Sequence, residues 1–202
     1  MLHEECPLIF RDKHLIGLDI ETSGLSILYN TIIEIGVVEV VNGRVKTSVT
    51  KMFGGGHSSM YLVRKVHHIS DKERKGLKTF SECAERISSF LNGSILVTHN
   101  GNAFDIPMIQ EKLRKAGYPL TDFKSIDTLQ LVRKMRKENK DDSDDKPGEV
   151  VRRNSLESLC HEFGLVYGGD SGSNAHRGLE DTEACLDLLF YLVNNKKVSI
   201  SF

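Results

Sequence analysis

The chain has 202 residues, of which 39% are hydrophobic and 27% are charged. This composition is typical of globular proteins and supplies enough chain to bury a sizeable core, so we expect a single domain over residues 1–202. The formal net charge of −1 excludes a strong basic field over the whole surface. Any binding of a polyanion should therefore be local and limited to a few phosphates.

The opening residues and the cysteines indicate the compartment. The first ten residues include two acidic residues, where a signal peptide would carry basic ones. No apolar run approaches the length of a membrane span. We expect an intracellular protein, cytoplasmic or, in a eukaryote, nuclear, with no membrane partner. The 4 cysteines lack a CxxC pair and the clustered spacing of a zinc site, so we interpret them as reduced and structural.

Three strands are predicted in the N-terminal part of the chain. Residues 14–21, 32–41 and 44–53 alternate or run apolar and are rich in β-branched side chains. Asn42-Gly43, between the second and third, is a strong hairpin turn. These segments predict a three-stranded meander.

The middle of the chain changes to alternating strands and helices. Residues 54–70 show no clear period, whereas apolar residues recur at helical spacing over 80–91, before Asn92-Gly93. The elements expected next are a strand at 95–98, a helix at 103–116 closed by Gly117, a strand at 124–127 and a helix at 128–137. This order predicts an α/β fold in which helices cover the faces of a mixed sheet.

Residues 137–153, KENKDDSDDKPGEVVRR, form a charged stretch that contains almost nothing apolar. It can add little to a core, and we expect a mobile insertion. Its acids lack the spacing, the glycine and the terminal glutamate of an EF-hand loop, so a solvated run is the better interpretation. Beyond it, Ser155 should cap a helix that ends near residue 163, and a last helix is expected at 179–194.

Asp19 and Glu21 are two residues apart on the first predicted strand. Their side chains therefore leave the same face, opposite to Ile16, Leu18 and Ile20. Two carboxylates on such a central strand are expensive to desolvate unless a cation or a basic side chain neutralises them. A lone D-x-E is more often a solvated strand end, so the interpretation depends on the other acids.

Asp105 and Asp181 each fall in the first turn of a predicted helix. Either one alone is explained by the helix dipole, which an acid there stabilises by roughly 0.3 to 1 kcal/mol. Together with Asp19 and Glu21, however, they occupy strand ends and helix starts that can face one cleft. Four carboxylates complement two hard cations such as Mg²⁺ or Mn²⁺, which can clamp the oxygens of a phosphodiester.

His176 precedes Asp181 by a gap of four residues and follows the glycine-rich segment 168–175. An unperturbed histidine has a pKa of about 6.5 and can take a proton from metal-bound water near neutral pH. It is our candidate general base. Without Asp181 beside it, a solvent-exposed loop histidine would be the default interpretation.

Three motifs in this order resemble those of the DEDDh exonucleases of the DnaQ-like superfamily. Asp19-Ile20-Glu21-Thr22 resembles the first motif, His99-Asn100 through Phe104-Asp105 the second, and His176 through Asp181 the third. Each motif alone is weakly specific, but the ordered set is highly specific. The second motif most resembles that of three-prime repair exonucleases and polymerase proofreading subunits.

This resemblance implies a ribonuclease H-like fold with a mixed five-stranded sheet flanked by helices. It also implies removal of nucleoside monophosphates from the 3′ ends of single-stranded DNA or RNA, with DNA slightly favoured. The implied metal ligands are Asp19, Glu21, Asp105 and Asp181, with His176 as base. The implied substrate-binding residues are Thr22, Ser23, Gly24 and Leu25. His99 and Asn100 either border the site or simply support the strand-to-helix turn. Ser23 departs from the threonine of many relatives.

Two alternatives stay open from the sequence. One keeps the catalytic site but changes the substrate, to short RNA fragments or RNA 3′ trimming. The other is a non-catalytic module that binds nucleic-acid ends or a protein, although a degenerate member would be expected to have lost an acid. Homodimerisation is compatible with such a compact nuclease, yet no helical stripe identifies an interface. The few aromatic residues are not interleaved with basic residues, so no stacking platform for long single strands is evident.

Overall fold

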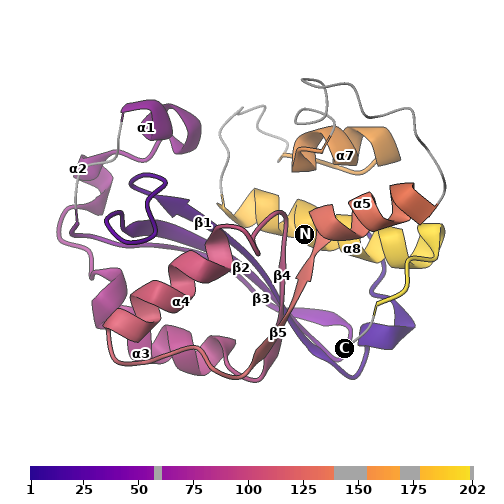
Figure 1. Ribbon diagram of the computed structural model, residues 1–202, viewed down its shortest axis with the longest axis horizontal. Helices are drawn as coiled ribbons and strands as arrows, with labels where there is room; N and C mark the ends of the chain where they lie inside the picture. The colour runs from indigo at the N-terminus through magenta and orange to yellow at the C-terminus, as the bar shows by residue number, and fades with distance from the viewer. Residues whose placement is uncertain (57–60, 139–153, 169–177, 201–202) are drawn as a thin grey trace.

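The computed structural model describes residues 1–56, 61–138, 154–168 and 178–200. After a short 3-10 helix at Leu8–Phe10, the elements are β1 (His14–Thr22), β2 (Ile32–Val41), β3 (Arg44–Met52), α1 (Tyr61–His67), α2 (Asp71–Arg74), α3 (Phe80–Leu91), β4 (Ser94–Thr98), α4 (Asp105–Lys115), β5 (Phe123–Asp127), α5 (Thr128–Glu138), α7 (Leu156–Phe163) and α8 (Gly178–Lys196). The strands form one sheet in the order β3-β2-β1-β4-β5. β1, β2 and β3 are antiparallel, whereas β4 and β5 run parallel to β1. The predicted mixed five-stranded sheet is confirmed (Figure 1).

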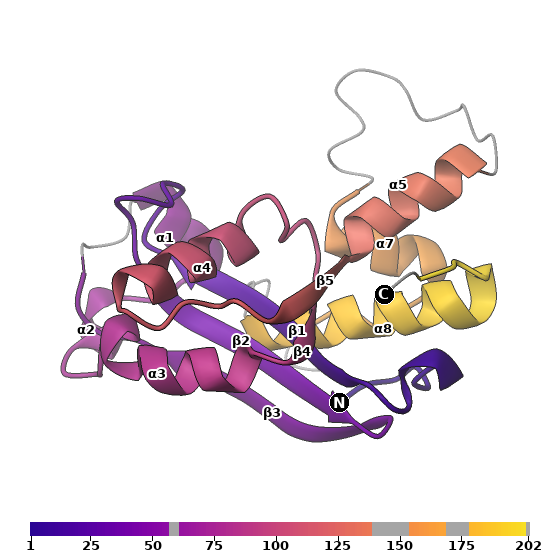
Figure 2. The same cartoon turned by 60° about the horizontal axis from the view of Figure 1, so that its bottom comes forward.

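Helices cover both faces of this sheet. Helices α3 and α4 lie on one face, and α8, with α5 and α7 beside it, lies on the other (Figures 1 and 2). On β1, Ile16, Leu18 and Ile20 belong to the core that includes side chains of α3 and α4. Gly17 faces α8, because a Cβ there would lie 2.7 Å from a side-chain carbon of Leu186. Asp19 and Glu21, in the same alternation as Gly17, therefore point to the α8 face, as the sequence predicts.

Close packing of glycines sets the position of the first turn of α8. A side chain at Gly36 of β2 would overlap the backbone of Gly178, so only glycine permits this approach. The Oγ1 of Thr182 then donates to the carbonyl of Gly36 at 3.3 Å. The backbone N–H of Gly178 donates to Oε1 of Glu34 at 3.4 Å. These contacts hold the start of α8 against β2 and hence beside β1.

The predicted strands and long helices are confirmed to within a few residues at their ends. Gly117, expected to close α4, has a φ of 87°, a left-handed conformation that favours glycine. The segment without a clear period contains the short helix α1, and the short helix α2 follows directly after it; sequence reasoning missed both. Their 7 and 4 residues are too few to establish a period. The Ser70-x-x-Glu73 capping box was the one available signal for α2.

Residues 139–153, most of the predicted charged insertion, lie outside the described residues, so its mobility stays a prediction. Cys6, Cys83, Cys160 and Cys185 are free thiols, and all but Cys83 are buried, which agrees with a structural role. None of the helices in the described ranges combines the length and apolarity that crossing a bilayer requires.

Candidate metal centre

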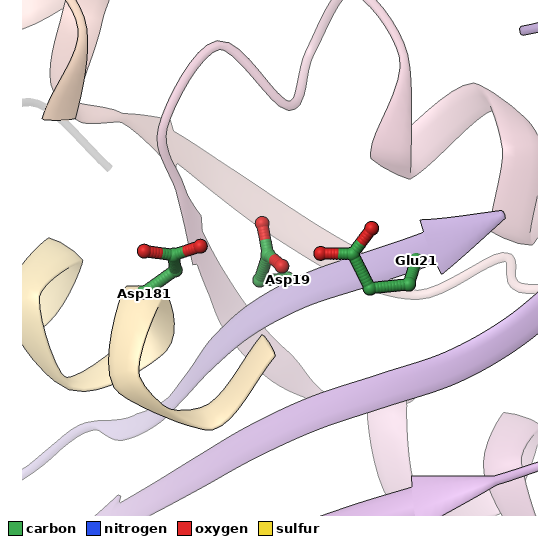
Figure 3. Close-up of side chains that lie close together, drawn as sticks. All are labelled: Asp19, Glu21 and Asp181. Carbon is green, nitrogen blue, oxygen red and sulfur yellow. The ribbon is translucent and has the colours of Figure 1, made fainter. Parts of the chain in front are cut away.

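Three carboxylates converge where the end of β1 meets the start of α8. Asp19, Glu21 and Asp181 each offer an oxygen, and these atoms all lie within 4.8 Å of one another. Figure 3 shows Asp19 and Glu21 on β1, with Asp181 facing them from the first turn of α8. Two-residue periodicity on the strand and the glycine contacts beneath the helix produce this arrangement. Three of the four predicted metal ligands are thus brought together.

Asp19 lies in a strongly acidic environment. Burial raises the pKa of its carboxyl group well above the ordinary value, and the neighbouring acids Asp105, Asp181, Glu21 and Glu34 raise it further. A cation bound among these oxygens would reverse both effects, because it favours the ionised carboxylate. The donor set consists of carboxylate oxygens, which suit hard divalent cations. The residues present therefore fit a divalent metal ion.

Asp105, the fourth predicted ligand, lies beside this cluster but is not one of the three converging residues. Its Oδ1 accepts a hydrogen bond from the backbone N–H of Ile20 at 3.3 Å, which ties the start of α4 to β1. Burial raises the pKa of Asp105 to about 6, against the lowering effect of backbone hydrogen bonds. Asp105 thus lies next to Asp19 in space, and its role as a ligand stays a prediction.

His176, our candidate general base, lies outside the described residues, so its role also stays a prediction. The structure adds a residue that sequence reasoning missed. The hydroxyl of Tyr167 donates to Oδ1 of Asp181 at 2.7 Å. Burial and the nearby Asp181 charge raise the pKa of Tyr167, so it remains a neutral donor. This contact orients Asp181, and no sequence pattern marks the tyrosine.

Glu34 is a second residue that was missed. It is fully buried on β2, paired in register with Glu21, and adds negative charge next to Asp19. Because it also accepts the N–H of Gly178, it helps to hold the start of α8. A signal was present, since Glu34 is one of two acids, with Glu39, in the otherwise apolar strand Ile32–Val41. A buried acid in such a strand needs a specific partner.

The end of β1 and the turn that follows it contain the four residues that the resemblance assigns to the terminal nucleotide. The hydroxyl of Thr22 donates to the carbonyl of Gly24 at 2.8 Å. The Ser23 N–H donates to the Thr31 carbonyl at 2.9 Å, and the Ser23 hydroxyl accepts from the Thr31 N–H at 3.0 Å. Thr22 and Ser23 therefore hold the turn itself. Leu25 is 76% exposed and remains available for contact with a base.

His99 and Asn100 support the strand-to-helix turn, one of the two roles that the sequence left open. Nδ1 of His99 bonds the Thr128 hydroxyl at 2.8 Å, and Nε2 bonds the Asn154 carbonyl at 2.9 Å. Burial, above all, lowers the pKa of His99. Asn100 adopts a left-handed φ of 61° and donates its N–H to Oδ1 of Asp127 at 2.9 Å. Both residues are thus engaged with the protein.

The fold and the acidic site are characteristic of nucleases, and the match to a family model identifies the family. The family model for RNase_T, described as Exonuclease, matches residues 16–189. The chain belongs to this exonuclease family. The resemblance to DnaQ-like exonucleases that the three motifs suggested is confirmed.

Curated relatives include much longer proteins. DNA polymerase III PolC-type of Listeria welshimeri is 27% identical over 205 residues, which cover 98% of this chain and 13% of that protein. The protein of the same name from Lacticaseibacillus paracasei is 28% identical over 186 residues, covering 92% of this chain and 12% of that protein. This chain therefore spans about an eighth of the length of these relatives.

Solved structures share the fold at low identity. Exonuclease I of E. coli in complex with a dT13 oligonucleotide has a TM-score of 0.76 at 15% identity, covering 92% of this chain and 42% of that chain. Exonuclease X in complex with 5′ overhanging duplex DNA has a TM-score of 0.65 at 22% identity, covering 92% of this chain and 94% of that chain. These likenesses confirm the predicted ribonuclease H-like architecture.

Proposed function

We propose that this chain is a metal-dependent 3′-to-5′ exonuclease that releases nucleoside monophosphates from single-stranded nucleic-acid ends. The observation that carries the proposal is the convergence of Asp19, Glu21 and Asp181, whose ligand oxygens lie within 4.8 Å of one another. Membership of the exonuclease family supplies the reaction class. The raised pKa of Asp19 adds the electrostatic reason why this group should take up a cation.

We assign two divalent cations, Mg²⁺ or Mn²⁺, to this site. Asp19, Glu21 and Asp181 would hold them, with Asp105 as the fourth ligand. When bound, such ions stabilise the charge that develops on the phosphodiester and lower the pKa of coordinated water. The protein's own contribution is to keep the carboxylates close together. Tyr167 orients Asp181 through its 2.7 Å hydrogen bond.

The remaining roles follow the family motifs. His176 is assigned as the base that takes a proton from the attacking water, because it occupies the histidine position of the third motif. Leu25, the exposed residue of the turn after β1, is assigned to contact the terminal base. Thr22, Ser23 and Gly24 shape that turn through their hydrogen bonds and close packing.

We favour DNA over RNA as substrate. The relatives are named as DNA polymerases, and the two structural neighbours are described with a dT13 oligonucleotide and with duplex DNA. RNA 3′ trimming is the alternative, and it differs only in how the site treats the 2′-hydroxyl.

Digestion of matched 5′-labelled DNA and RNA oligonucleotides with Mg²⁺ or Mn²⁺ tests the proposal. We expect a ladder shortened from the 3′ end, formed faster on DNA, and no ladder with Asp19→Ala. Faster shortening of RNA would favour the RNA-trimming alternative. If neither substrate is shortened with either metal, the proposal fails. Tight binding of an oligonucleotide without shortening would instead favour the non-catalytic module.

A further inference from the structure

A groove of about 540 Å³ lies between the outer strand β3 and helix α3. Figures 1 and 2 show α3 on the face of the sheet opposite to α8. Val37 and Val49 contribute apolar walls from the sheet, and Ile87 and Phe90 contribute them from α3. Val49 is 45% exposed, and Ile87 and Phe90 are half-buried. A single exposed valine needs no explanation, but apolar side chains gathered in a groove indicate a binding surface.

The edge of β3 is open to further pairing. This strand is first in the sheet order and, among the described residues, pairs with β2 alone. Its outer edge therefore presents backbone N–H and C=O groups that an extended peptide can pair with. A strand added there would direct alternate side chains to the face that carries Val49, into the groove.

The charges of β3 argue against a second copy of this chain as the occupant. The strand carries Arg44, Lys46 and Lys51 and no acid. Lys46 pairs with Glu39 of β2 at 3.4 Å, but antiparallel pairing of two copies of β3 would still bring two Arg44 and two Lys51 side chains to one junction. This is unfavourable because like charges on adjacent strands repel. Lysines on an edge strand are a common device against such self-pairing. The same charges favour an acidic strand.

The groove itself repeats this positive charge. Lys51 lines it from β3, and Lys78 and Arg86 line it from the α3 side. Its one acid, Glu82, accepts hydrogen bonds from the N–H and the hydroxyl of Thr79, so its carboxylate caps α3. In the part of the chain that the structure describes, no ion pair joins Lys51 or Arg86 to an acid. An acidic partner could satisfy both.

We propose that the β3–α3 groove binds an extended acidic segment of a partner protein. The partner segment pairs with the outer edge of β3 as an additional strand. Its alternate apolar side chains contact Val49, Ile87 and Phe90. Its carboxylates face Lys51 and Arg86. Because the groove is separate from the carboxylates of the metal centre, the partner can hold the protein without covering that centre. The proposal does not depend on nuclease activity.

Selection from a phage-displayed random peptide library on the intact protein, followed by fluorescence anisotropy with the enriched peptides, tests this proposal. We expect enrichment of peptides that mix acidic with apolar residues and whose binding weakens with added salt. Lys51→Glu and Arg86→Glu should each weaken binding about tenfold, and the double variant more. Arg133→Glu, an equal charge change at an exposed position on α5, should have no effect.

Val49→Asp tests the apolar wall, with circular dichroism to confirm folding. It should remove peptide binding while leaving digestion of oligonucleotides unchanged. If Val49→Asp does not fold, the exposed Lys51→Glu and Arg86→Glu variants still decide the matter. Enriched peptides that are not acidic, or whose binding ignores these substitutions, would overturn the proposal. Sedimentation showing a dimer that Val49→Asp dissociates would overturn it in favour of a second copy.

Discussion

Two aspartates at the same end of the sheet, the half-buried Asp19 and the buried Asp127, have opposite surroundings. Asp127 ends β5, and its carboxylate accepts backbone N–H groups from both sides. Oδ1 accepts from Asn100 at 2.9 Å, from Leu129 at 3.0 Å and from Gln130 at 3.4 Å. Oδ2 accepts from Asn102 at 3.2 Å. Fixed donors of the chain satisfy this charge, so Asp127 caps α5 and holds the preceding turn.

Asp19, near the end of β1, has acids where Asp127 has donors. Among the described residues, none donates a hydrogen bond to its carboxylate, while Glu21, Asp105 and Asp181 crowd it and raise its pKa. The comparison teaches how a structural acid differs from a candidate site residue. The charge of a carboxylate that accepts backbone N–H groups is already satisfied by the protein, whereas a carboxylate surrounded by other carboxylates is neutralised by a proton or by a bound cation.

The distinction between Asp19 and Asp127 is tested most strongly by replacing each of them with asparagine. Asp19→Asn should lower the exonuclease rate by about a thousandfold, because a metal ligand contributes several kcal/mol of transition-state stabilisation. Asp127→Asn should lower the free energy of unfolding while the folded protein keeps most of its activity. Single-turnover digestion and denaturant unfolding measure the two effects. Equal activity losses in both variants would remove the distinction.

Replacing the proposed base should give the next largest effect. His176→Ala is expected to lower the rate about a hundredfold or more, since general-base catalysis contributes on that order. The metal affinity should stay unchanged, because His176 is not assigned as a ligand. Rate measurements beside Mn²⁺ titrations check both points, and a variant with the parent's rate would refute the assignment.

Tyr167→Phe should have a smaller effect on the same site. Loss of the hydrogen bond to Asp181 is expected to lower metal affinity or activity by about 10 to 100-fold, as for other residues that orient metal ligands. Excess Mn²⁺ should restore part of the rate. Tyr191→Phe is the matched control, because that ring stacks on Phe163 with centroids 5.3 Å apart and lies away from Asp181. If both variants respond alike, Tyr167 has no special role.

The smallest effect is on stability in the absence of metal. Burial raises the pKa of Asp105 from 3.8 to about 6, so the folded state binds this proton more tightly than the unfolded chain. Its stabilising contribution is therefore full below pH 3.8 and is lost as pH rises through about 6. Asp105→Asn should flatten this part of the stability profile, as urea unfolding in EDTA would measure. An unchanged slope would contradict the burial of this group.

The sequence predicted the part of the site that depends on local periodicity. Alternation on a strand placed Asp19 and Glu21 on one face, and the helix start placed Asp181 at its end. The sequence could not give the distance between Asp105 and these three carboxylates, because that distance depends on how α4 packs beside β1. The pairing of Glu34 with Gly178 joins residues 144 positions apart and has no local pattern.

The contacts of the turn residues His99 and Ser23 could not be predicted from the local sequence either. His99 is held by Asn154, which is 55 residues away, and no local pattern in the sequence predicts this supporting contact. Thr31 likewise engages both the amide and the hydroxyl of Ser23. The open strand edge of β3 and the groove beside it also exist only once the sheet order is known.

The most direct test of the metal centre is calorimetric titration of the protein with Mn²⁺ near neutral pH. We predict saturable binding to the parent protein, loss of that binding in Asp19→Asn, and retention in Asp127→Asn. Absence of binding to the parent protein, or equal binding by the Asp19→Asn variant, would contradict the claim that these carboxylates form a cation site.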